Sequence, residues 1–165
     1  MSRVLSLDPG NVATGWNIID RDTLRPLQFD KTENRELARM MMDGELEFDE
    51  FVSERVRSYG MAVGREVFLT CEWTGRFVQI AMEKGVPVSY IHRKDEKLHI
   101  CGDSRAKDMN LRRALVERFA QHDLKNGKGN KKDKDWFYGF HGNDIWAAYC
   151  VGLTFIEAGP SEVEA

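Results

Sequence analysis

The sequence of 165 residues lacks long apolar runs: none approaches the roughly 18 residues needed to cross a bilayer. It has only three cysteines, Cys71, Cys101 and Cys150, which are widely spaced and form no Cys-x-x-Cys pattern. This usage predicts buried thiols in a reducing compartment, and argues against a disulfide framework or a zinc site. The N-terminus lacks the features of a signal peptide. We therefore expect a cytoplasmic protein without a membrane partner.

The composition is that of a globular protein, with 42% hydrophobic and 31% charged residues. A chain of this length can bury a substantial core in one unit. We predict a single domain over residues 1–158 and a flexible C-terminal tail over residues 159–165.

Charge is unevenly distributed along the chain. The net charge is −3, yet the segment from His92 to Lys134 contains 13 Lys and Arg and 7 Asp and Glu, a balance of +6. The rest of the chain has a balance of −9. A basic segment on an acidic body predicts one face that binds polyanions. The alternative is an ordinary solvated surface.

The N-terminal segment predicts a β-hairpin with a carboxylate at the end of its first strand. An apolar run, Val4–Leu7, is followed by Asp8-Pro9-Gly10, and a second apolar run covers Thr14–Ile19. Proline pre-sets one turn torsion, and we expect the glycine to adopt the positive one and to let a ligand approach closely. The alternative is an ordinary hairpin whose aspartate bonds its own turn.

Hydrophobic periodicity predicts an α/β fold with a mixed β-sheet (an antiparallel hairpin plus parallel strands) and helices on both faces. The predicted strands cover residues 4–7, 14–19, 27–31, 66–72 and 86–91. Five helices are predicted. The first begins near Asn34, the second runs from Leu46 to Gly60, and the third contains Phe77 and ends at Gly85. The last two cover residues 107–119 and 144–157. The segment 125–134 is a polar, glycine-bearing loop that we expect to be mobile.

Two of these predicted strands end in a carboxylate. Glu72 ends the strand 66–72, and Asp8 ends the first strand. If the strands are parallel neighbours, both side chains emerge at one sheet edge, where a divalent metal would offset their repulsion. His141 and Asp144 lie three residues apart at the start of the last helix and could face the same point. Each also has a simpler explanation: a turn residue, a strand-end polar group, a surface histidine and a helix N-cap.

The ordered set of Asp-Pro-Gly-Asn hairpin, strand-end Glu, basic-flanked helix and His-x-x-Asp before an Ala-rich helix resembles the RuvC-like Holliday-junction resolvases, which belong to the RNase H-like nuclease superfamily. Further stretches are similar to the bacteriophage-encoded branch. These stretches are Lys31–Leu37, Lys107–Leu115, Tyr138–Phe140 and Asp144–Ala148. The resemblance extends from Arg3 to about Glu157.

The resemblance implies roles for individual residues. Asp8, Glu72 and Asp144 match the catalytic carboxylates, and His141 matches a position that is Asp or His among members. Lys107 matches a basic residue near the scissile phosphate. Trp73 and Phe77 are candidates for the aromatic residue that follows the second carboxylate and helps to open the junction. The residues that we expect to contact nucleic acid are Arg76, Arg105, Lys107, Arg112, Lys128, Lys131 and Lys132.

The implied activity is metal-dependent hydrolysis of branched DNA through paired nicks. The carboxylates would hold two Mg²⁺ ions, one to activate water and one to stabilise the leaving oxygen, and Mn²⁺ is the expected substitute. His141 would bind metal or act as a general base, and Lys107 would offset transition-state charge. Paired nicks imply a homodimer, with residues 77–82 and 48–56 as a possible interface. A phage-encoded enzyme would act in the host cytoplasm.

Other functions compete with this one. The chain could be a related nuclease that acts on flaps, forks or RNA, or a nucleic-acid-binding module without catalysis. The Asp-x-Gly hairpin also resembles the first phosphate loop of actin-like ATPases and sugar kinases, but those need two such domains, which 165 residues cannot supply.

Overall fold

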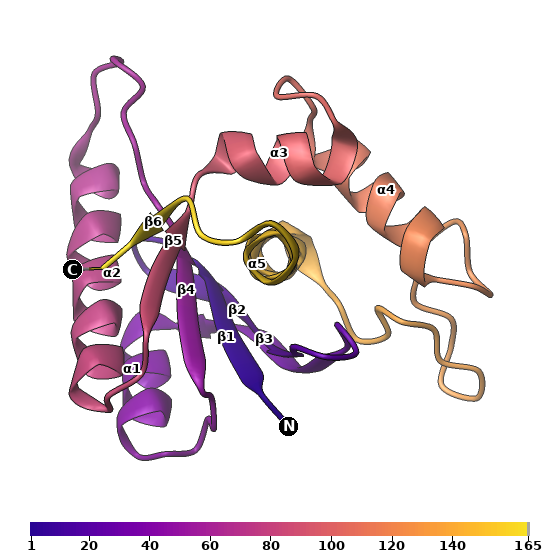
Figure 1. The fold of residues 1–165 in the computed structure, drawn as a ribbon, viewed down its shortest axis with the longest axis horizontal. Coiled ribbons are helices and arrows are strands. Elements are labelled where there is room, and N and C mark those ends of the chain that lie inside the picture. Colours follow the sequence, from indigo (N-terminus) through magenta and orange to yellow (C-terminus); the bar gives the residue numbers. More distant parts are fainter. Residues whose placement is uncertain (165) are drawn as a thin grey trace.

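The computed structural model describes residues 1–164 and shows one six-stranded sheet, in the order β3-β2-β1-β4-β5-β6 (Figure 1). Strands β1, β2 and β3 form an antiparallel meander, β4 and β5 run parallel to β1, and β6 is antiparallel to β5. The strands are β1 (Arg3–Asp8), β2 (Ala13–Asp20), β3 (Pro26–Glu33), β4 (Glu50–Glu54), β5 (Val88–Ile91) and β6 (Glu162–Val163).

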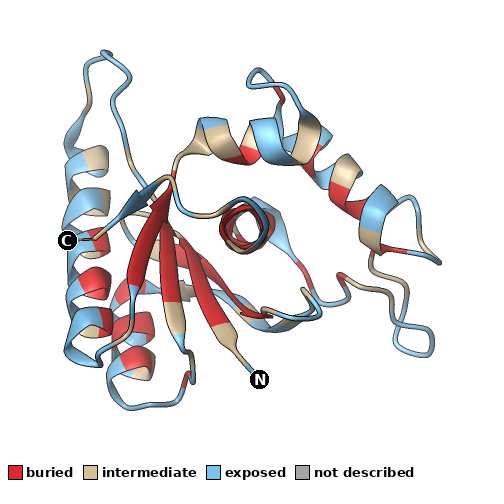
Figure 2. Cartoon of the chain, viewed as in Figure 1, coloured by how far each residue is buried: buried red, intermediate tan, exposed pale blue. Residues whose placement is uncertain are grey.

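Helices cover both faces of the sheet. One face packs against α1 and α2, and the other against α5, beyond which α3 and α4 form a further layer (Figure 1). Most of α5 is buried between the sheet and that outer layer (Figure 2). The helices are α1 (Asn34–Met42), α2 (Arg65–Glu83), α3 (Arg93–Cys101), α4 (Asp108–Phe119) and α5 (Gly142–Ala158). The predicted mixed sheet with helices on both faces is confirmed.

Alternation along β1 assigns its side chains to the two faces. Leu5 and Leu7 belong to the core beneath α1 and α2. Val4 packs with Val151 of α5, so the even-numbered residues face α5. Asp8, the last residue of β1, therefore lies on the α5 face of the sheet.

Two predicted elements are wrong in type. The segment predicted as the helix Leu46–Gly60 contains β4, and the segment predicted as the strand Glu66–Glu72 forms the beginning of α2. Phe51, Val52 and Ser53 of β4 are all fully buried because β4 pairs with parallel strands on both sides. A central parallel strand covered on both faces has no polar alternation, so its apolar residues can imitate helical spacing.

The pattern of burial explains why α2 is a helix. Its buried residues, Thr74, Phe77, Val78 and Ala81, follow the i, i+3, i+4, i+7 spacing of one helical face. The Val-Phe-Leu-Thr-Cys run that suggested a strand lies on the first turns of this helix, where Phe68 is 60% exposed. Gly85 follows the helix with φ +73°, as a helix-terminating glycine does.

Two observed elements were not predicted, and the cysteines are not all buried as expected. The helix α3 and the short strand β6 were not predicted, and β6 lies in the segment predicted as a flexible tail, of which residue 165 falls outside the described residues. Cys150 is buried as expected, whereas Cys71 is exposed. Within residues 1–164, no helix has both the length and the apolar character that a membrane span needs.

Candidate active site

Two carboxylates lie side by side where β1 and β4 end. Leu7 pairs with Ser53 across the parallel strands, and the next residue of each strand is Asp8 and Glu54. Val52 packs with Val151 of α5, so alternation places Glu54 on the α5 face, as it does Asp8. The prediction of two carboxylates at adjacent parallel strand ends thus holds for the geometry, but the second residue is Glu54.

Glu72 does not take part in this arrangement. It is an exposed residue of α2, on the opposite face of the sheet from α5. Its assignment as a strand-end ligand is wrong because the segment 66–72 is helical. The missed signal was the sequence Glu50-Phe51-Val52-Ser53-Glu54, a short apolar run that ends in a carboxylate just as β1 does.

The third carboxylate, Asp144, comes from the first turn of α5 and lies directly over β2. A Cβ atom built on Gly15 would be 2.3 Å from the carbonyl oxygen of Asp144, so the absence of a side chain lets α5 approach the sheet. The amide of Asn17 donates to the carbonyl of Ile145 at 2.9 Å and fixes the same turn of α5 on β2. Since Gly15 pairs with Asp8, Asp144 lies next to Asp8.

The three acids are close enough to shift the pKa of Asp8. Burial raises this pKa well above its usual value, and the charges of Glu54 and Asp144 and a hydrogen bond with Asp144 raise it further. The positive charge of Arg93 acts in the opposite direction. Such repulsion among clustered carboxylates is typical of sites that bind cations or catalyse reactions.

The positive charge of Arg93, at the start of α3, compensates part of this negative charge. Its guanidinium donates to Glu96 at 3.1 Å and forms an ion pair with Asp108 at the start of α4. Glu96 is fully buried, and burial and the charge of Glu54 raise its pKa well above the usual value. Arg93 thus joins α3 to α4, and its positive charge acts on Asp8 and Glu54 at the ends of β1 and β4.

A buried hydrogen-bond network shapes the turn that follows Asp8. Thr14 donates to Asn34 at 2.6 Å, and the amide of Asn34 donates to the carbonyl of Gly10 at 2.9 Å. A Cβ atom on Gly10 would lie 2.2 Å from the carbonyl oxygen of Ala13. Gly10 is therefore required for close backbone approach, and the expectation of a positive φ at Gly10 is wrong.

His141 and Lys107 both lie at helix starts. His141 immediately precedes α5, is 66% exposed on its side chain and pairs with Asp30 of β3 at 3.2 Å, so its contact is to the edge of the sheet. Lys107 is exposed before α4, where its backbone N–H donates to Asn110. The neighbouring Asp108 contacts Arg93, which brings this helix start towards the carboxylates. The roles predicted for both residues stay predictions.

The arginines predicted to contact nucleic acid lie on different surfaces. Arg76 stacks over Trp73 on α2, which is on the other face of the sheet from Asp144. Arg112 donates to Asn143 at 2.6 Å beside the start of α5. Arg105 is 91% exposed on its side chain, in the connection between α3 and α4. Arg105 and Arg112 share the side of the sheet that carries the carboxylates, and Arg76 does not.

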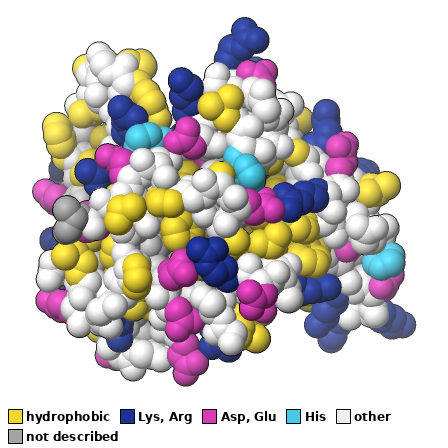
Figure 3. All heavy atoms as spheres, in the orientation of Figure 1, with side chains coloured by type: hydrophobic (Ala, Val, Ile, Leu, Met, Phe, Trp, Pro, Cys, Tyr) yellow, Lys and Arg dark blue, Asp and Glu magenta, His cyan; other side chains and the backbone are white. Residues whose placement is uncertain are grey.

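The lysine-rich segment between α4 and α5 is a folded loop. Asp123 accepts from the backbone N–H groups of Asn126 and Gly129, which lowers its pKa, and Asp135 accepts from the backbone at the other end of the loop. Gly129 and Lys134 form a β-bridge. Lys and Arg side chains gather at this edge of the molecule (Figure 3). The lysines of this loop, which we call the basic loop, are Lys125, Lys128, Lys131, Lys132 and Lys134.

The chemistry of the acidic cluster suits a hard divalent cation, because Asp8, Glu54 and Asp144 offer carboxylate oxygens at one sheet edge. Among residues 1–164, however, no three Asp, Glu, His or Cys side chains converge closely enough to enclose an ion. Lys31 of β3 lies beside these acids, with its Nζ 2.6 Å from Asp144 Oδ2. The chemistry of the three carboxylates thus fits a metal site, but their side chains would have to move closer together to hold an ion.

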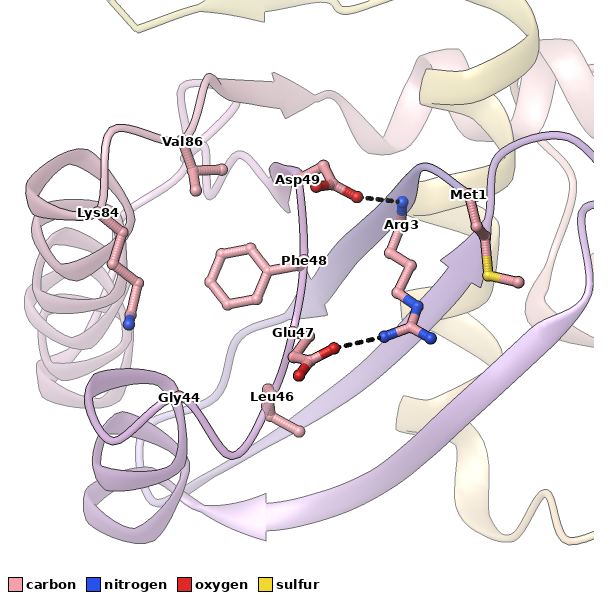
Figure 4. A pocket seen from close by; sticks show the side chains of 9 residues that line it. All are labelled: Met1, Arg3, Gly44, Leu46, Glu47, Phe48, Asp49, Lys84 and Val86. Atoms are coloured by element: carbon pink, nitrogen blue, oxygen red, sulfur yellow. Dashed lines mark hydrogen bonds and ion pairs between the residues drawn. The ribbon is translucent and has the colours of Figure 1, made fainter.

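A separate hollow lies at the other end of β1, far from these acids (Figure 4). There the backbone N–H of Arg3 donates to Asp49 at 2.8 Å, and its guanidinium donates to Glu47 at 2.9 Å. Both acceptors lie in the segment that leads into β4. The contacts hold the N-terminal strand to this segment, and we assign the hollow no function.

Replacing Gly15 by alanine tests whether the close packing of α5 on β2 depends on this glycine. The new Cβ would clash with the backbone of Asp144, so we expect a loss of about 1–3 kcal/mol in the free energy of unfolding. Gly75→Ala is the matched control, because Gly75 is exposed in α2 with nothing within 4 Å of its Cβ position, and it should be neutral or stabilising. Urea denaturation measures both. Equal effects would mean that α5 does not depend on Gly15.

Comparisons with known proteins find matches among solved structures. No protein-family model matches the chain, and no curated protein matches its sequence. A structure of Thermus thermophilus RuvC in complex with a Holliday junction substrate superimposes with a TM-score of 0.72, covering 99% of this chain and 100% of that chain at 14% identity. A second T. thermophilus RuvC structure gives a TM-score of 0.67, with 98% and 99% coverage at 14% identity. The chain therefore has a RuvC-like fold.

Proposed function

We propose that this chain with a RuvC-like fold is a structure-selective endonuclease that resolves four-way DNA junctions by metal-dependent hydrolysis. The observation that carries the proposal is the grouping of Asp8, Glu54 and Asp144 at one edge of the sheet, on three separate elements. One similar structure contains a Holliday junction substrate, which gives the substrate class. The basic loop adds a surface suited to DNA phosphates.

Asp8, Glu54 and Asp144 would hold the divalent ions, Mg²⁺ or Mn²⁺, with two ions as the expected number. When bound, the ions supply a nucleophilic water and stabilise the charge on the leaving 3′ oxygen. The chain's own residues provide the support. Arg93 offsets negative charge from the protein interior, and His141 is exposed at the start of α5, where a water could reach its ring.

Contacts to DNA would come from the side of the sheet that carries α3, α4 and the basic loop. Phosphate contacts position a nuclease without reading sequence, which suits recognition of junction shape. The aromatic residue that helps to open a junction would be neither Trp73 nor Phe77, since Phe77 is fully buried and Trp73 packs beside it on α2. Tyr59, five residues after Glu54 and 60% exposed, is the better candidate.

The proposal includes a homodimer, because two paired nicks need two active sites related by the approximate symmetry of the junction. The segment Phe48–Val56 is not an interface helix, as it contains β4 with Phe51 and Val52 fully buried. The outer face of α2 remains the candidate interface. The resemblance to the bacteriophage-encoded branch also makes the host cytoplasm the proposed site of action.

A panel of labelled DNA and RNA substrates tests the proposed function. Four-way junctions, forks, flaps and RNA duplexes are incubated with the protein and Mg²⁺, and the nick positions are mapped. We expect symmetric paired nicks across the four-way junction and no cleavage when EDTA replaces Mg²⁺. Unpaired cuts on flaps or RNA would favour a different nuclease activity, and cleavage-free junction binding would indicate a binding module.

The basic loop makes its own prediction about DNA binding. Each lysine that neutralises a phosphate contributes about −0.9 to the slope of log K against log salt on duplex DNA. Replacing Lys128, Lys131 and Lys132 by alanine should weaken junction binding and reduce the steepness of that slope by up to about 3. Fluorescence anisotropy at several salt concentrations measures it, with Lys84→Ala at the end of α2 as the control. An unchanged slope would remove the loop from the DNA interface.

A further inference from the structure

The edge strand β3 places a cation, Lys31, beside the acidic cluster of Asp8, Glu54 and Asp144. Lys31 is not among the residues for which a catalytic role was predicted. Lys31 pairs with Gly15 in the β2–β3 register, and Gly15 pairs with Asp8 in the β1–β2 register. Directly paired residues of antiparallel strands point to the same face. Asp8 and Lys31 therefore flank Gly15 on the face where Asp144 lies.

Because Gly15 has no side chain, nothing separates the lysine from the helix above it. Lys31 Nζ lies 2.6 Å from Asp144 Oδ2, and the two side chains are 49% and 38% exposed. The hydrogen bond to Asp144 and its charge raise the pKa of Lys31, and the charge of Asp8 raises it slightly more. The ammonium group thus lies against an oxygen of Asp144, one of the proposed metal ligands.

We propose that Lys31 is a built-in counter-ion that competes with divalent metal for Asp144 and is displaced when metal binds. This inference rests on the proposed metal site at Asp8, Glu54 and Asp144. The lysine fits a removable cation, since its side chain is half exposed and its four-carbon stem is flexible. Arg93, whose side chain is 25% exposed and held by Glu96 and Asp108, is in contrast a fixed one.

The competition has a definite electrostatic consequence. A positive charge in contact with a metal ligand lowers the affinity of the site for a cation, so removing that charge should raise it. A lysine that only supported the position of Asp144 would have the opposite effect, since its loss would weaken metal binding. The sign of the change therefore separates the two roles.

Calcium titration of the full chain without DNA tests the proposal, because Ca²⁺ binds carboxylate oxygens and the readout does not depend on cleavage. By isothermal titration calorimetry, Lys31→Met should bind Ca²⁺ about tenfold more tightly than the wild type. Lys31→Arg, which keeps the charge, should stay close to the wild type. Lys84→Met, at the far end of the sheet, is the matched control and should not change the affinity.

The stability of the same variants gives a second readout. Without metal, Lys31→Met should unfold at a lower temperature than the wild type, and saturating Ca²⁺ should raise its Tm by more. Equal or weaker Ca²⁺ binding by Lys31→Met, with normal binding by the wild type, overturns this inference alone. Failure of the wild type and of Lys31→Met to bind Ca²⁺ at all overturns the proposed metal site and the inference with it.

Discussion

Asp8→Asn should reduce Mg²⁺-dependent junction cleavage by at least about 10²–10³-fold, the scale on which one group directed at a transition state acts. Asparagine has the same shape but lacks the negative charge that would hold a divalent ion. Junction binding in EDTA should be unchanged, because the proposed phosphate contacts come from the basic loop and not from Asp8. Single-turnover cleavage of a labelled junction and anisotropy binding measure the two quantities.

The stability of Asp8→Asn provides its control. The folded-state pKa of Asp8 is raised by burial and by Glu54 and Asp144, so ionised Asp8 costs stability at neutral pH. The metal-free variant should therefore melt at the same temperature as the wild type or higher, and lost activity cannot come from unfolding. Full cleavage activity in a folded Asp8→Asn protein would exclude Asp8 from the site.

Glu54→Gln and Glu72→Gln should behave in opposite ways. Glu54 is the last residue of β4 and lies next to Asp8, and its amide variant should lose cleavage by about as much as Asp8→Asn. Glu72 is exposed on α2 at the other face, and its variant should retain wild-type cleavage and stability. The two substitutions make the same chemical change, so each is the matched control for the other.

Parallel measurements of both glutamine variants decide which glutamate serves the reaction. A wild-type rate for Glu54→Gln together with an inactive Glu72→Gln would restore the interpretation from sequence, and would require α2 to approach the carboxylates in the bound state. Loss of activity in both variants would indicate a role for α2 in binding or assembly. Melting temperatures of both proteins exclude unfolding as the cause.

Local sequence rules sufficed where an element is defined by its own residues. The β1–β2 hairpin was predicted from the Asp8-Pro9-Gly10 turn between two apolar runs, and α5 from the largely apolar stretch of residues 144–157. Asp8 and Asp144 lie next to such local signals, a strand end and a helix start. Both were therefore found, and both are in the acidic cluster.

Glu54 was missed because its strand is defined by its neighbours. Between β1 and β5, the residues Phe51 to Ser53 are buried on both faces, and their spacing from Phe48 and Val56 also matches a helix. The segment 66–72 shows the reverse case, because its β-branched and aromatic residues favour a strand, yet the later residues of α2 supply the buried helical face. Propensity was overridden by packing in both segments.

The sequence by itself determined the fold class, the turn that presents Asp8, the helix start that presents Asp144 and the concentration of positive charge before α5. Each of these depends on residues that are close together along the chain. Only the tertiary structure decided that Glu54 lies beside Asp8 in the acidic cluster, that Lys31 reaches Asp144 over Gly15 and that the charge of Arg93 acts on the cluster. Those contacts join distant segments, and they depend on strand order, register and burial, which no local pattern encodes.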